Sequence, residues 1–427
     1  MTWHTSRRLL GAGSLVLASA LVLGACSSSA ADPTTSASGS SSTSSAASGS
    51  GDLTSSSDPL TLLIASSGEA ETTAVETAVA AWSADSGVEA NVQVASDLAQ
   101  QLSQGFAAGS PPDLFYMSPD AIGGYAGNGS LKAYGDLLTN KADFYGPLVD
   151  NFTVDGDFYC APKDFSTLAL VINTDLWTAA GLTDADLPKT WDDLTAVSAT
   201  LTADGRTGLA FGPEFQRIGV FFAEAGGGLV VDGAAAANSP ENVEALTYVQ
   251  SNLNDGNFAF SSDLGAGWGG EAFGKQLAAM VIEGNWITGA MTNDFPDVNY
   301  LVTELPSGPG GPGTLQYTNC WGMAADSPNQ QAALELVEYL TAPDQQLAFS
   351  AAFGPMPSIA SAADAWTAAN PTLSAFLAGA QYAQYLPSQV GSNEVVSDLN
   401  SQLESLKDGD PAAILDSVQG NLEAVIK

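Results

Sequence analysis

The chain has 427 residues, of which 47 are acidic and 11 are lysine or arginine, so its formal net charge at pH 7 is −36. Such an excess of acid argues against electrostatic binding to nucleic acid or to an anionic membrane surface. His4 is the only histidine and falls in the signal segment predicted below, so the mature chain would have none. This excludes a Ser-His-Asp triad, a Cys-His pair and a histidine-ligated zinc site. No metal or organic cofactor is expected.

The first residues are typical of a secretory signal. Arg7 and Arg8 precede an apolar run from Leu9 to Leu23, which is too short to span a bilayer comfortably. Cys26 follows Leu23-Gly24-Ala25, and this pattern resembles the lipobox of bacterial lipoproteins, whose cysteine becomes the lipidated N-terminus. We therefore expect a signal over 1–25, a lipid on Cys26, and a protein anchored to the outer face of the cell membrane. The alternative is an ordinary signal beside an incidental cysteine.

A serine-rich segment follows the predicted anchor. Residues 27–57 are almost entirely Ser, Ala, Gly and Thr, with Leu53 as the only large apolar residue, so the segment cannot bury a core. We predict a flexible linker over 26–58. The remainder, from Pro59 to Lys427, has ordinary globular composition and a length that favours two domains.

Two cysteines lie in the globular part, Cys160 and Cys320. In an exported protein an even pair favours a disulfide over a redox or metal site, because two sulfurs alone make a poor zinc site. Two buried thiols without a bond remain the alternative.

The first elements alternate between strand and helix. Residues 60–65 read as a buried strand, and residues 68–87 place Val75, Val79 and Trp82 on one helical face that ends at Gly87. A strand over 88–94, a helix over 98–107 and a strand over 113–117 are predicted next. This succession indicates an α/β fold with a mainly parallel sheet covered on both faces.

Later helix starts carry their own signals. Thr190 with Asp193 forms the pattern of a capping box, and Ser239-Pro240 and Ser327-Pro328 place a cap before a proline at the first helical position. The glycine- and proline-rich stretch 308–313 is predicted to be a surface turn, because no lysine follows it in the spacing of a phosphate loop.

The order of seven segments resembles the maltose-binding-protein-like, sugar-type extracellular solute-binding proteins (family 1) of ABC importers. These segments are 82–92, 107–126, 158–177, 188–194, 273–286, 298–306 and 322–346. The resemblance implies a two-lobe, periplasmic-binding-protein-like fold of class II, with central mixed sheets, flanking helices and a hinge. It also implies a first lobe over 59–164 and 301–350 and a second over 165–300 and 351–427. Both cysteines would then lie in the first lobe, where a disulfide is plausible.

The same resemblance implies a binding protein and not an enzyme. It would capture a saccharide between the lobes and deliver it to the membrane permease subunits of an ABC transporter, and it would be a monomer that binds no nucleic acid. Two alternatives stay open: a non-sugar ligand such as a polyamine, and an exported glycoside hydrolase whose acid and base would be Asp120 and Glu214.

A saccharide needs an aromatic platform and many hydrogen-bonding side chains. Trp286 matches the stacking tryptophan of the family, Asp120 an aspartate on sugar hydroxyls, and Glu214 a glutamate of the second lobe. Weaker candidates are Ser66, Ser67 and Glu69 after the first strand, and Asp164 and Ser166 at the first crossover. The remaining candidates are possible wall residues of the cleft: Tyr116, Met117, Gln216, Trp268 and Asn393. Because Met117 and Val396 fall near positions where the dextrin binder of the family has tryptophan, we expect a short ligand.

Overall fold

The computed structural model describes residues 53–426. Cys26, the predicted signal and the linker up to residue 52 lie outside the described residues, so the predictions made for them stay predictions. The end of the predicted linker is held in place and is not a flexible coil: Thr54 Oγ1 donates to the Ser327 carbonyl at 2.7 Å, and the Gln331 amide donates to the Thr54 carbonyl at 3.0 Å.

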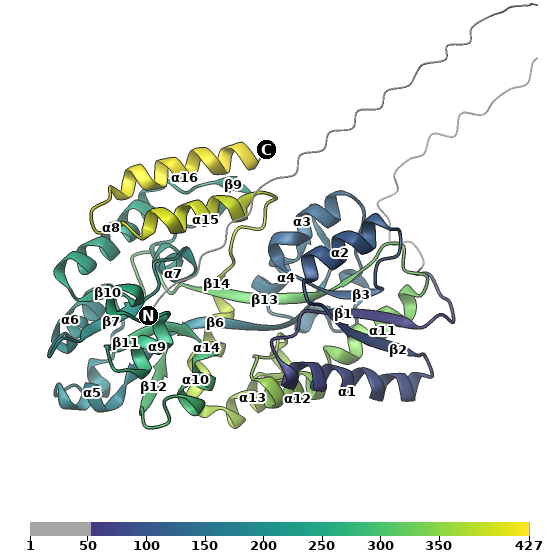
Figure 1. The fold of residues 1–427 in the computed structure, drawn as a ribbon, viewed down its shortest axis with the longest axis horizontal. Coiled ribbons are helices and arrows are strands. Elements are labelled where there is room, and N and C mark those ends of the chain that lie inside the picture. Colours follow the sequence, from purple (N-terminus) through teal and green to yellow (C-terminus); the bar gives the residue numbers. More distant parts are fainter. Residues whose placement is uncertain (1–52, 427) are drawn as a thin grey trace, which may run out of the picture. The chain divides into compact units, whose positions relative to one another are not determined.

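Strands of the described chain form one ten-stranded mixed sheet and two short hairpins, with helices on both sides (Figure 1). The order in the large sheet is β10-β7-β11-β6-β13-β3-β1-β2, with β12 beside β6 and β14 beside β13. The strands are β1 (Leu60–Ile64), β2 (Ala90–Val94), β3 (Leu114–Met117), β4 (Thr153–Val154), β5 (Asp157–Phe158), β6 (Ala161–Asn173), β7 (Thr207–Phe211), β8 (Val230–Val231), β9 (Ala234–Ala235), β10 (Phe258–Phe260), β11 (Ala278–Gly284), β12 (Tyr300–Thr303), β13 (Thr314–Met323) and β14 (Ala383–Gln384).

The α-helices range from short turns to the 18 residues of α1. They are α1 (Glu69–Ser86), α2 (Leu98–Ala107), α3 (Pro119–Gly127), α4 (Gly146–Asn151), α5 (Thr174–Ala179), α6 (Trp191–Leu201), α7 (Phe215–Ala225), α8 (Pro240–Asp255), α9 (Gly269–Gly274), α10 (Ile287–Asn293), α11 (Gln330–Leu340), α12 (Pro343–Phe353), α13 (Ala363–Ala369), α14 (Ser374–Ala378), α15 (Ser392–Leu403) and α16 (Pro411–Val425). Over residues 53–426, no helix is both long and apolar enough to cross a membrane.

The predicted β-α-β-α-β start is confirmed. Strand β1 pairs in parallel with β2 on one side and with β3 on the other. Helix α1 buries Val75, Val79 and Trp82 and ends at Gly87, whose φ of 75° places it in the left-handed region that glycine adopts at little cost. The apolar spacing therefore correctly identified the face that packs on the sheet.

Helix starts are confirmed in two cases and wrong in one. Thr190 and Asp193 form the capping box of α6, and the Ser239 side chain caps α8. Helix α11, however, begins at Gln330 after Asn329, two residues beyond Pro328. The physical reason is that the Ser327 hydroxyl donates to Asp113 Oδ1 at 2.7 Å and accepts from the Asn329 amide at 3.3 Å, so it closes a turn before the helix begins. The stretch 308–313 is a turn as expected, closed by a bridge between Gly308 and Gly311.

Two long strands run through the middle of the sheet. The first half of β6 pairs antiparallel with β13, whereas its second half pairs with β11 and β12. Strand β13 continues beyond β6 to pair with β3, after a shift in register between Asn319 and Cys320. Both strands therefore connect the β1–β3 side of the sheet to the β7–β11 side.

Buried apolar side chains form a core on each side of these strands. The first core includes Leu62, Phe115 and Trp321, and the second includes Phe211, Phe222 and Leu415. The predicted lobe boundaries at 301 and 350 do not coincide with the division between these two cores. Leu315 packs in the second core, and Ile359 packs in the first.

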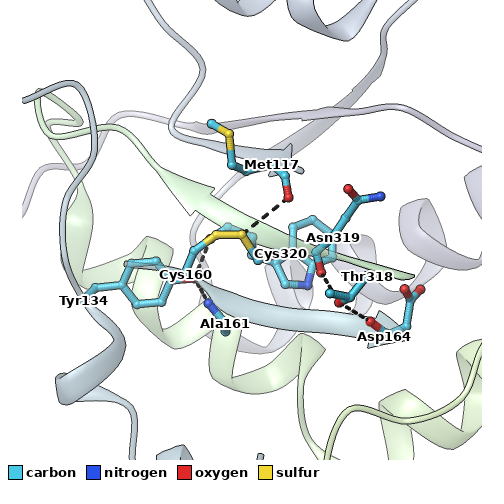
Figure 2. Close-up of a disulfide and its surroundings, with 9 residues drawn as sticks. Met117, Tyr134, Cys160, Ala161, Asp164, Thr318, Asn319 and Cys320 are labelled. Atoms are coloured by element: carbon cyan, nitrogen blue, oxygen red, sulfur yellow. Dashed lines mark hydrogen bonds between the residues drawn. A yellow bond between two sulfur atoms is a disulfide. The ribbon is translucent and has the colours of Figure 1, made fainter. Parts of the chain in front are cut away.

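A disulfide joins Cys160 to Cys320, with 5.6 Å between their Cα atoms, and both residues belong to the first core (Figure 2). The predicted bond is confirmed. Tyr134 reinforces the same junction, since its hydroxyl accepts a hydrogen bond from the Ala161 amide at 2.9 Å and donates one to the Trp321 carbonyl. The start of β6 is thus fastened to β13 by one covalent and two polar links.

Candidate functional site

Two cavities meet at the paired strands β6 and β13, which run from one core to the other. One, the α3 chamber, has a volume of about 390 Å³ and extends toward Asp120 at the start of α3. The other, the α1 chamber, has a volume of about 660 Å³ and extends toward Ser67, just before α1. Asp164, Ser166, Trp286 and Asn319 line both. We call the two chambers together the cleft.

A larger hollow of about 720 Å³ lies between α1 and α12, and it is lined mainly by alanine and threonine. Its one aromatic lining residue is Phe349, which is buried in the core and offers no exposed ring. Because a small-molecule site combines apolar surface with a few placed polar groups, the cleft is the stronger candidate.

Trp286 is presented to the cleft by the junction between β11 and α10. Its ring lies so close to the backbone that a Cβ added to Gly284 would come within 2.3 Å of the ring, so the glycine is required here. The indole Nε1 donates to Glu283 Oε2 at 2.9 Å. With 39% of the residue exposed, Trp286 offers ring surface while its orientation is set by the protein.

The support of Trp286 extends to α7 and β13. The Arg217 guanidinium forms an ion pair with the buried Glu283 carboxylate at 2.8 Å, and its Cζ lies 5.3 Å from the centre of the Trp286 ring. Tyr317 meets the same ring edge-on, with 5.5 Å between centroids. Charge pairing and aromatic contacts therefore fix the ring before any ligand arrives.

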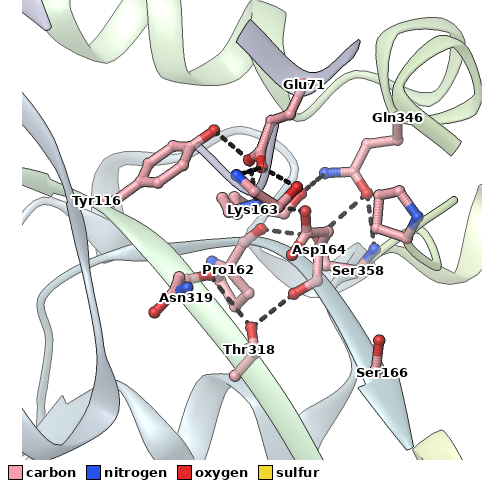
Figure 3. A network of polar contacts seen from close by, with 12 residues as sticks. Glu71, Tyr116, Pro162, Lys163, Asp164, Ser166, Thr318, Asn319, Gln346 and Ser358 are labelled. Atoms are coloured by element: carbon pink, nitrogen blue, oxygen red, sulfur yellow. Dashed lines mark hydrogen bonds and ion pairs between the residues drawn. The ribbon is translucent and has the colours of Figure 1, made fainter. Parts of the chain in front are cut away.

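A buried charged cluster lies on the wall of the α1 chamber (Figure 3). Lys163 Nζ contacts Glu71 Oε1 at 3.1 Å and also pairs with Asp164. The Tyr116 hydroxyl donates to Glu71 Oε1 at 2.9 Å, and the amide and hydroxyl of Ser67 both donate to Glu71 Oε2 at 2.7 Å. Every charge of the cluster thus has a partner of opposite sign, as buried charges require.

The pKa values follow from this pairing. Burial alone would lower the pKa of Lys163, but the carboxylates of Asp164 and Glu71 reverse that effect and raise it. Burial raises the pKa of Glu71, and the ammonium of Lys163 and the bonds from Ser67 outweigh it and lower the pKa. Burial, with a smaller contribution from the Glu71 carboxylate, raises the pKa of Asp164 although Lys163 opposes the shift. Lys163 stays a cation near neutral pH, and its one ammonium is shared by the two carboxylates of the wall.

A hydrogen bond at the α3 chamber joins the two lobes. Asn393 Nδ2, at the start of α15, donates to Asp120 Oδ2, at the start of α3, with 2.6 Å between the two atoms. Helix α3 belongs to the side of the first core through Ile122, and α15 to the second through Val395. Both residues line the α3 chamber.

The structure brings half of the predicted site residues to the cleft. Those that line it are Ser66, Ser67, Asp120, Asp164, Ser166, Trp286 and Asn393. Sequence reasoning missed others that line it, among them Glu71, Asn151, Lys163, Asn285, Gln316, Tyr317, Thr318 and Asn319. Lys163 had a signal, because a lysine beside Asp164 at a predicted crossover is unusual in so acidic a chain.

Tyr116 and Met117 do not reach the cleft surface, contrary to expectation. Both lie in β3, between β1 and β13, and each is only 1% exposed. Tyr116 instead supports the buried charges and packs against Trp321 at 4.9 Å between ring centroids. A central strand is covered on both faces, so neither of its alternating faces offers a wall position.

Four other candidates also lie away from the lining of the cleft. Glu69 lines the hollow between α1 and α12. Glu214 precedes α7, where its carboxylate lies 3.9 Å from Arg217 Nη1, and the Gln216 side chain accepts a bond from Asn400 at 3.0 Å. Trp268 folds against Gly270 and packs on a buried cluster. The side chains of Glu214, Gln216 and Trp268 are used for local packing or pairing.

No group of three or more potential metal ligands occurs among the described residues. The lining instead offers amides, hydroxyls and carboxylates around one tryptophan, a set suited to a ligand held by stacking and hydrogen bonds.

Comparisons with known proteins agree with this geometry. The sequence matches the family model of bacterial extracellular solute-binding proteins over residues 77–375. A relative in Brucella abortus (strain 2308), named as a binding protein, is 25% identical over 346 residues, which cover 77% of this chain and 83% of that protein.

Two solved structures share the fold. The cyclic α-maltosyl-1,6-maltose binding protein of Arthrobacter globiformis has a TM-score of 0.76 and 22% identity, covering 87% of this chain and 99% of that one. The sugar-binding protein MalE of Xanthomonas citri has a TM-score of 0.77 and 20% identity, covering 86% and 97%. The predicted two-lobe α/β fold is confirmed, and at these identities the ligand must be inferred from the cleft.

Proposed function

Because this chain belongs to the bacterial extracellular solute-binding proteins, we propose that it captures a mono- to short oligosaccharide in the cleft between its lobes. The observation that carries the proposal is Trp286, a ring 39% exposed at the meeting point of both chambers. A sugar ring can stack on such a platform while its hydroxyls bond to the surrounding amides and hydroxyls.

The cellular part of the proposal rests on the sequence. The signal-like residues 1–25 and Cys26 support export and attachment through a lipid to the outer face of the cell membrane. Membership of the family supports delivery of the ligand to the permease subunits of an ABC importer. We propose that the protein acts there as a monomer.

A polyamine is the second candidate ligand, because Asp120 and Asp164 line the α3 chamber. It is the weaker candidate, since Lys163 belongs to the lining of the α1 chamber, where its charge would repel an ammonium group, and Asp164 already contacts this lysine. The glycoside hydrolase alternative is set aside: the family consists of binding proteins, and Glu214 does not line the chamber that contains Asp120.

A thermal-shift screen tests the proposal directly. The full chain, kept unlipidated by Cys26→Ser, is melted with glucose, maltose, trehalose, sucrose, maltotriose, putrescine and spermidine. A ligand present at about 100 times its Kd stabilises the native state by about 2.7 kcal/mol, so a bound saccharide should raise Tm by several degrees. A shift with the polyamines and with none of the saccharides would contradict the proposal.

A further inference from the structure

We infer that residues 385–393, which we call the strap, act as a gate on the α3 side of the cleft. The strap leads from β14 to α15 (Figure 1), and its Leu386, Pro387 and Asn393 line the α3 chamber. It is carried by the second lobe, docks on α3 of the first lobe, and controls how fast a ligand enters and leaves the chamber. The docking goes beyond the proposed function, and its effect on a ligand rests on that function.

The strap is fixed to the second lobe and has a defined shape. Leu386 packs against the second core, and Gly391 has a φ of 87° and lies so close to α16 that an added Cβ would be 3.0 Å from Val425 Cγ1. The Ser392 hydroxyl donates to the Pro387 carbonyl at 3.0 Å. The strap therefore moves together with α15 and α16.

Helix α3 presents a face without side chains to the strap. A Cβ built on Gly123 would lie 3.6 Å from the Ser388 carbonyl oxygen, and one built on Gly124 would lie 3.8 Å from Val390 Cγ2. Neither glycine has a positive φ, and glycine weakens the interior of a helix relative to alanine. Close approach of the strap accounts for both glycines, because a bulky side chain at either position would meet it.

The docking contacts are few and weak. Asn393 Nδ2 donates to Asp120 Oδ2 at 2.6 Å, and both residues are exposed. Val390 remains 64% exposed, so its contact with α3 buries little apolar surface. All of these contacts join residues of the chain, and none requires a ligand as a bridge. The strap can therefore dock by itself, and it can also open readily.

This arrangement has a kinetic consequence. Because the chain makes the docking contacts whether or not a ligand occupies the chamber, the contacts oppose entry and exit alike. Weakening them should raise the association and dissociation rates together and change Kd much less. Loss of a contact to the ligand itself has a different effect, since it acts mainly on the dissociation rate.

A cysteine pair tests the docking without any ligand. In the full chain with Cys26→Ser, Gly124→Cys with Val390→Cys should form a disulfide with oxidised glutathione at least about tenfold faster than Gly127→Cys with Val390→Cys. Gly127 belongs to the same helix and has nothing within 4 Å of an added Cβ. Intact mass after alkylation measures the reaction, and circular dichroism checks the fold. Equal rates for the two pairs overturn the inference.

Charge reversal tests the polar contact in the same cysteine pair. Asn393→Asp places a second carboxylate against Asp120, so the disulfide should form about fivefold more slowly, and high salt should reduce this effect. Adding Asp120→Asn to Asn393→Asp restores a donor and an acceptor in exchanged places, and it should restore the rate to within about twofold. A double variant as slow as Asn393→Asp alone would overturn docking through Asp120.

Ligand exchange tests the gate. Stopped-flow tryptophan fluorescence is measured with maltose, or with the screened saccharide that gives the largest thermal shift. Gly124→Leu, outside the lining of the α3 chamber, should raise both rates about fivefold, the effect of losing contacts as weak as one exposed hydrogen bond, and keep Kd within about threefold. Gly127→Leu, the matched control, should exchange ligand like the parent.

The two kinds of experiment separate the inference from the proposed function. An association rate in Gly124→Leu equal to that of the parent would show that closure waits for the ligand, and it would overturn the gate even though a saccharide binds. Rapid formation of the disulfide between Gly124→Cys and Val390→Cys in a protein that binds no saccharide would support the docking and contradict the proposed function.

Discussion

At the scale of single residues, Trp286 combines exposure with rigidity. Its Nε1 is bonded to Glu283, and Glu283 is paired with Arg217, so the ring is held in one place by groups that no ligand has to order. Such preorganisation reduces the entropy cost of binding. The affinity for a saccharide should therefore depend strongly on this one side chain.

Trp286→Ala is expected to abolish measurable saccharide binding and to leave the fold intact. Loss of a large aromatic anchor costs about 4 kcal/mol at a buried hot spot, which is about a thousandfold in affinity. Titration calorimetry measures the affinity, and circular dichroism checks the fold. Trp268→Ala removes the same kind of ring outside the cleft lining and should bind like the parent. Binding by Trp286→Ala within threefold of the parent would show that the tryptophan is merely packed.

A second single residue, Glu224, affects the stability of the folded protein. It is fully buried in α7, its Oε2 accepts a bond from Trp191 Nε1 at 2.5 Å, and its Oε1 has no partner in the described chain. Burial raises the pKa of Glu224 well above its usual value, and the bond from Trp191 only partly opposes this. The folded protein therefore keeps a proton that the unfolded chain has lost.

Glu224→Gln should make stability less dependent on pH. Because the folded pKa is raised, the contribution of Glu224 is fully present below about pH 4.5, the ordinary range of a glutamate, and is lost as pH rises toward the folded pKa. The Tm of the variant minus that of the parent should therefore be larger at pH 8 than at pH 5. A difference that is constant across this range in thermal melts would contradict the assignment.

At the scale of elements, β6 and β13 carry both the connection between the lobes and the middle of the cleft. The Cys160–Cys320 disulfide lies within the first core, at the end of the paired stretch away from Ser166 and Gln316. The bond therefore stabilises one lobe while the segments toward the second lobe are held only by hydrogen bonds and packing.

Replacing both cysteines, Cys160→Ser with Cys320→Ser, should lower stability and leave ligand affinity within about twofold. The two residues are 160 apart in sequence, for which the chain-entropy model assigns roughly 5 kcal/mol as an upper bound. Denaturant melts measure the loss, and intact mass after alkylation without reductant checks the bond in the parent. Two alkylated thiols in the parent, besides any at Cys26, would refute the bond.

At the scale of the whole molecule, the cleft is divided and has few platforms. Its chambers of about 390 and 660 Å³ meet at Trp286. Met117 and Val396, 1% and 5% exposed, are core residues and offer no stacking surface. Tyr385 is 41% exposed but does not line either chamber.

Affinity should accordingly stop rising after two or three sugar units. Each stacked ring contributes on the order of 1 kcal/mol beyond burial, by analogy with aromatic pairs, and the described cleft supplies one well-exposed platform. Calorimetry with maltose to maltohexaose, or with the homologous series of whichever saccharide binds, provides the measurement. An affinity that keeps increasing to the hexasaccharide would reveal platforms that form only when ligand is bound.

Local rules in the sequence determined most of the elements. The bounds of α2, the buried face of α1, the end at Gly87 and the capping box at Thr190 follow from side chains within a few positions of one another. The helix start at Ser327-Pro328 failed because the Ser327 hydroxyl, held by the distant Asp113, accepts from the Asn329 amide and closes a turn before the helix. A local capping signal can therefore mark a turn when a tertiary hydrogen bond holds the same side chain.

Which side chains face the cleft was decided only by the tertiary structure. The Asp120–Asn393 contact joins residues 273 positions apart, and the Ser166–Asn285 contact joins residues 119 apart. Sequence periodicity contains no information about contacts between such distant residues. The resemblance predicted that Tyr116 and Met117 line the cleft, although β3 is covered on both faces. The sequence by itself predicted the fold class, the cysteine pair and the place of Trp286 at the cleft, because composition, pairing chemistry and motif order act without knowledge of distance. The contact between Lys163 and Glu71 required coordinates, because it joins residues 92 positions apart that only the folded chain brings together.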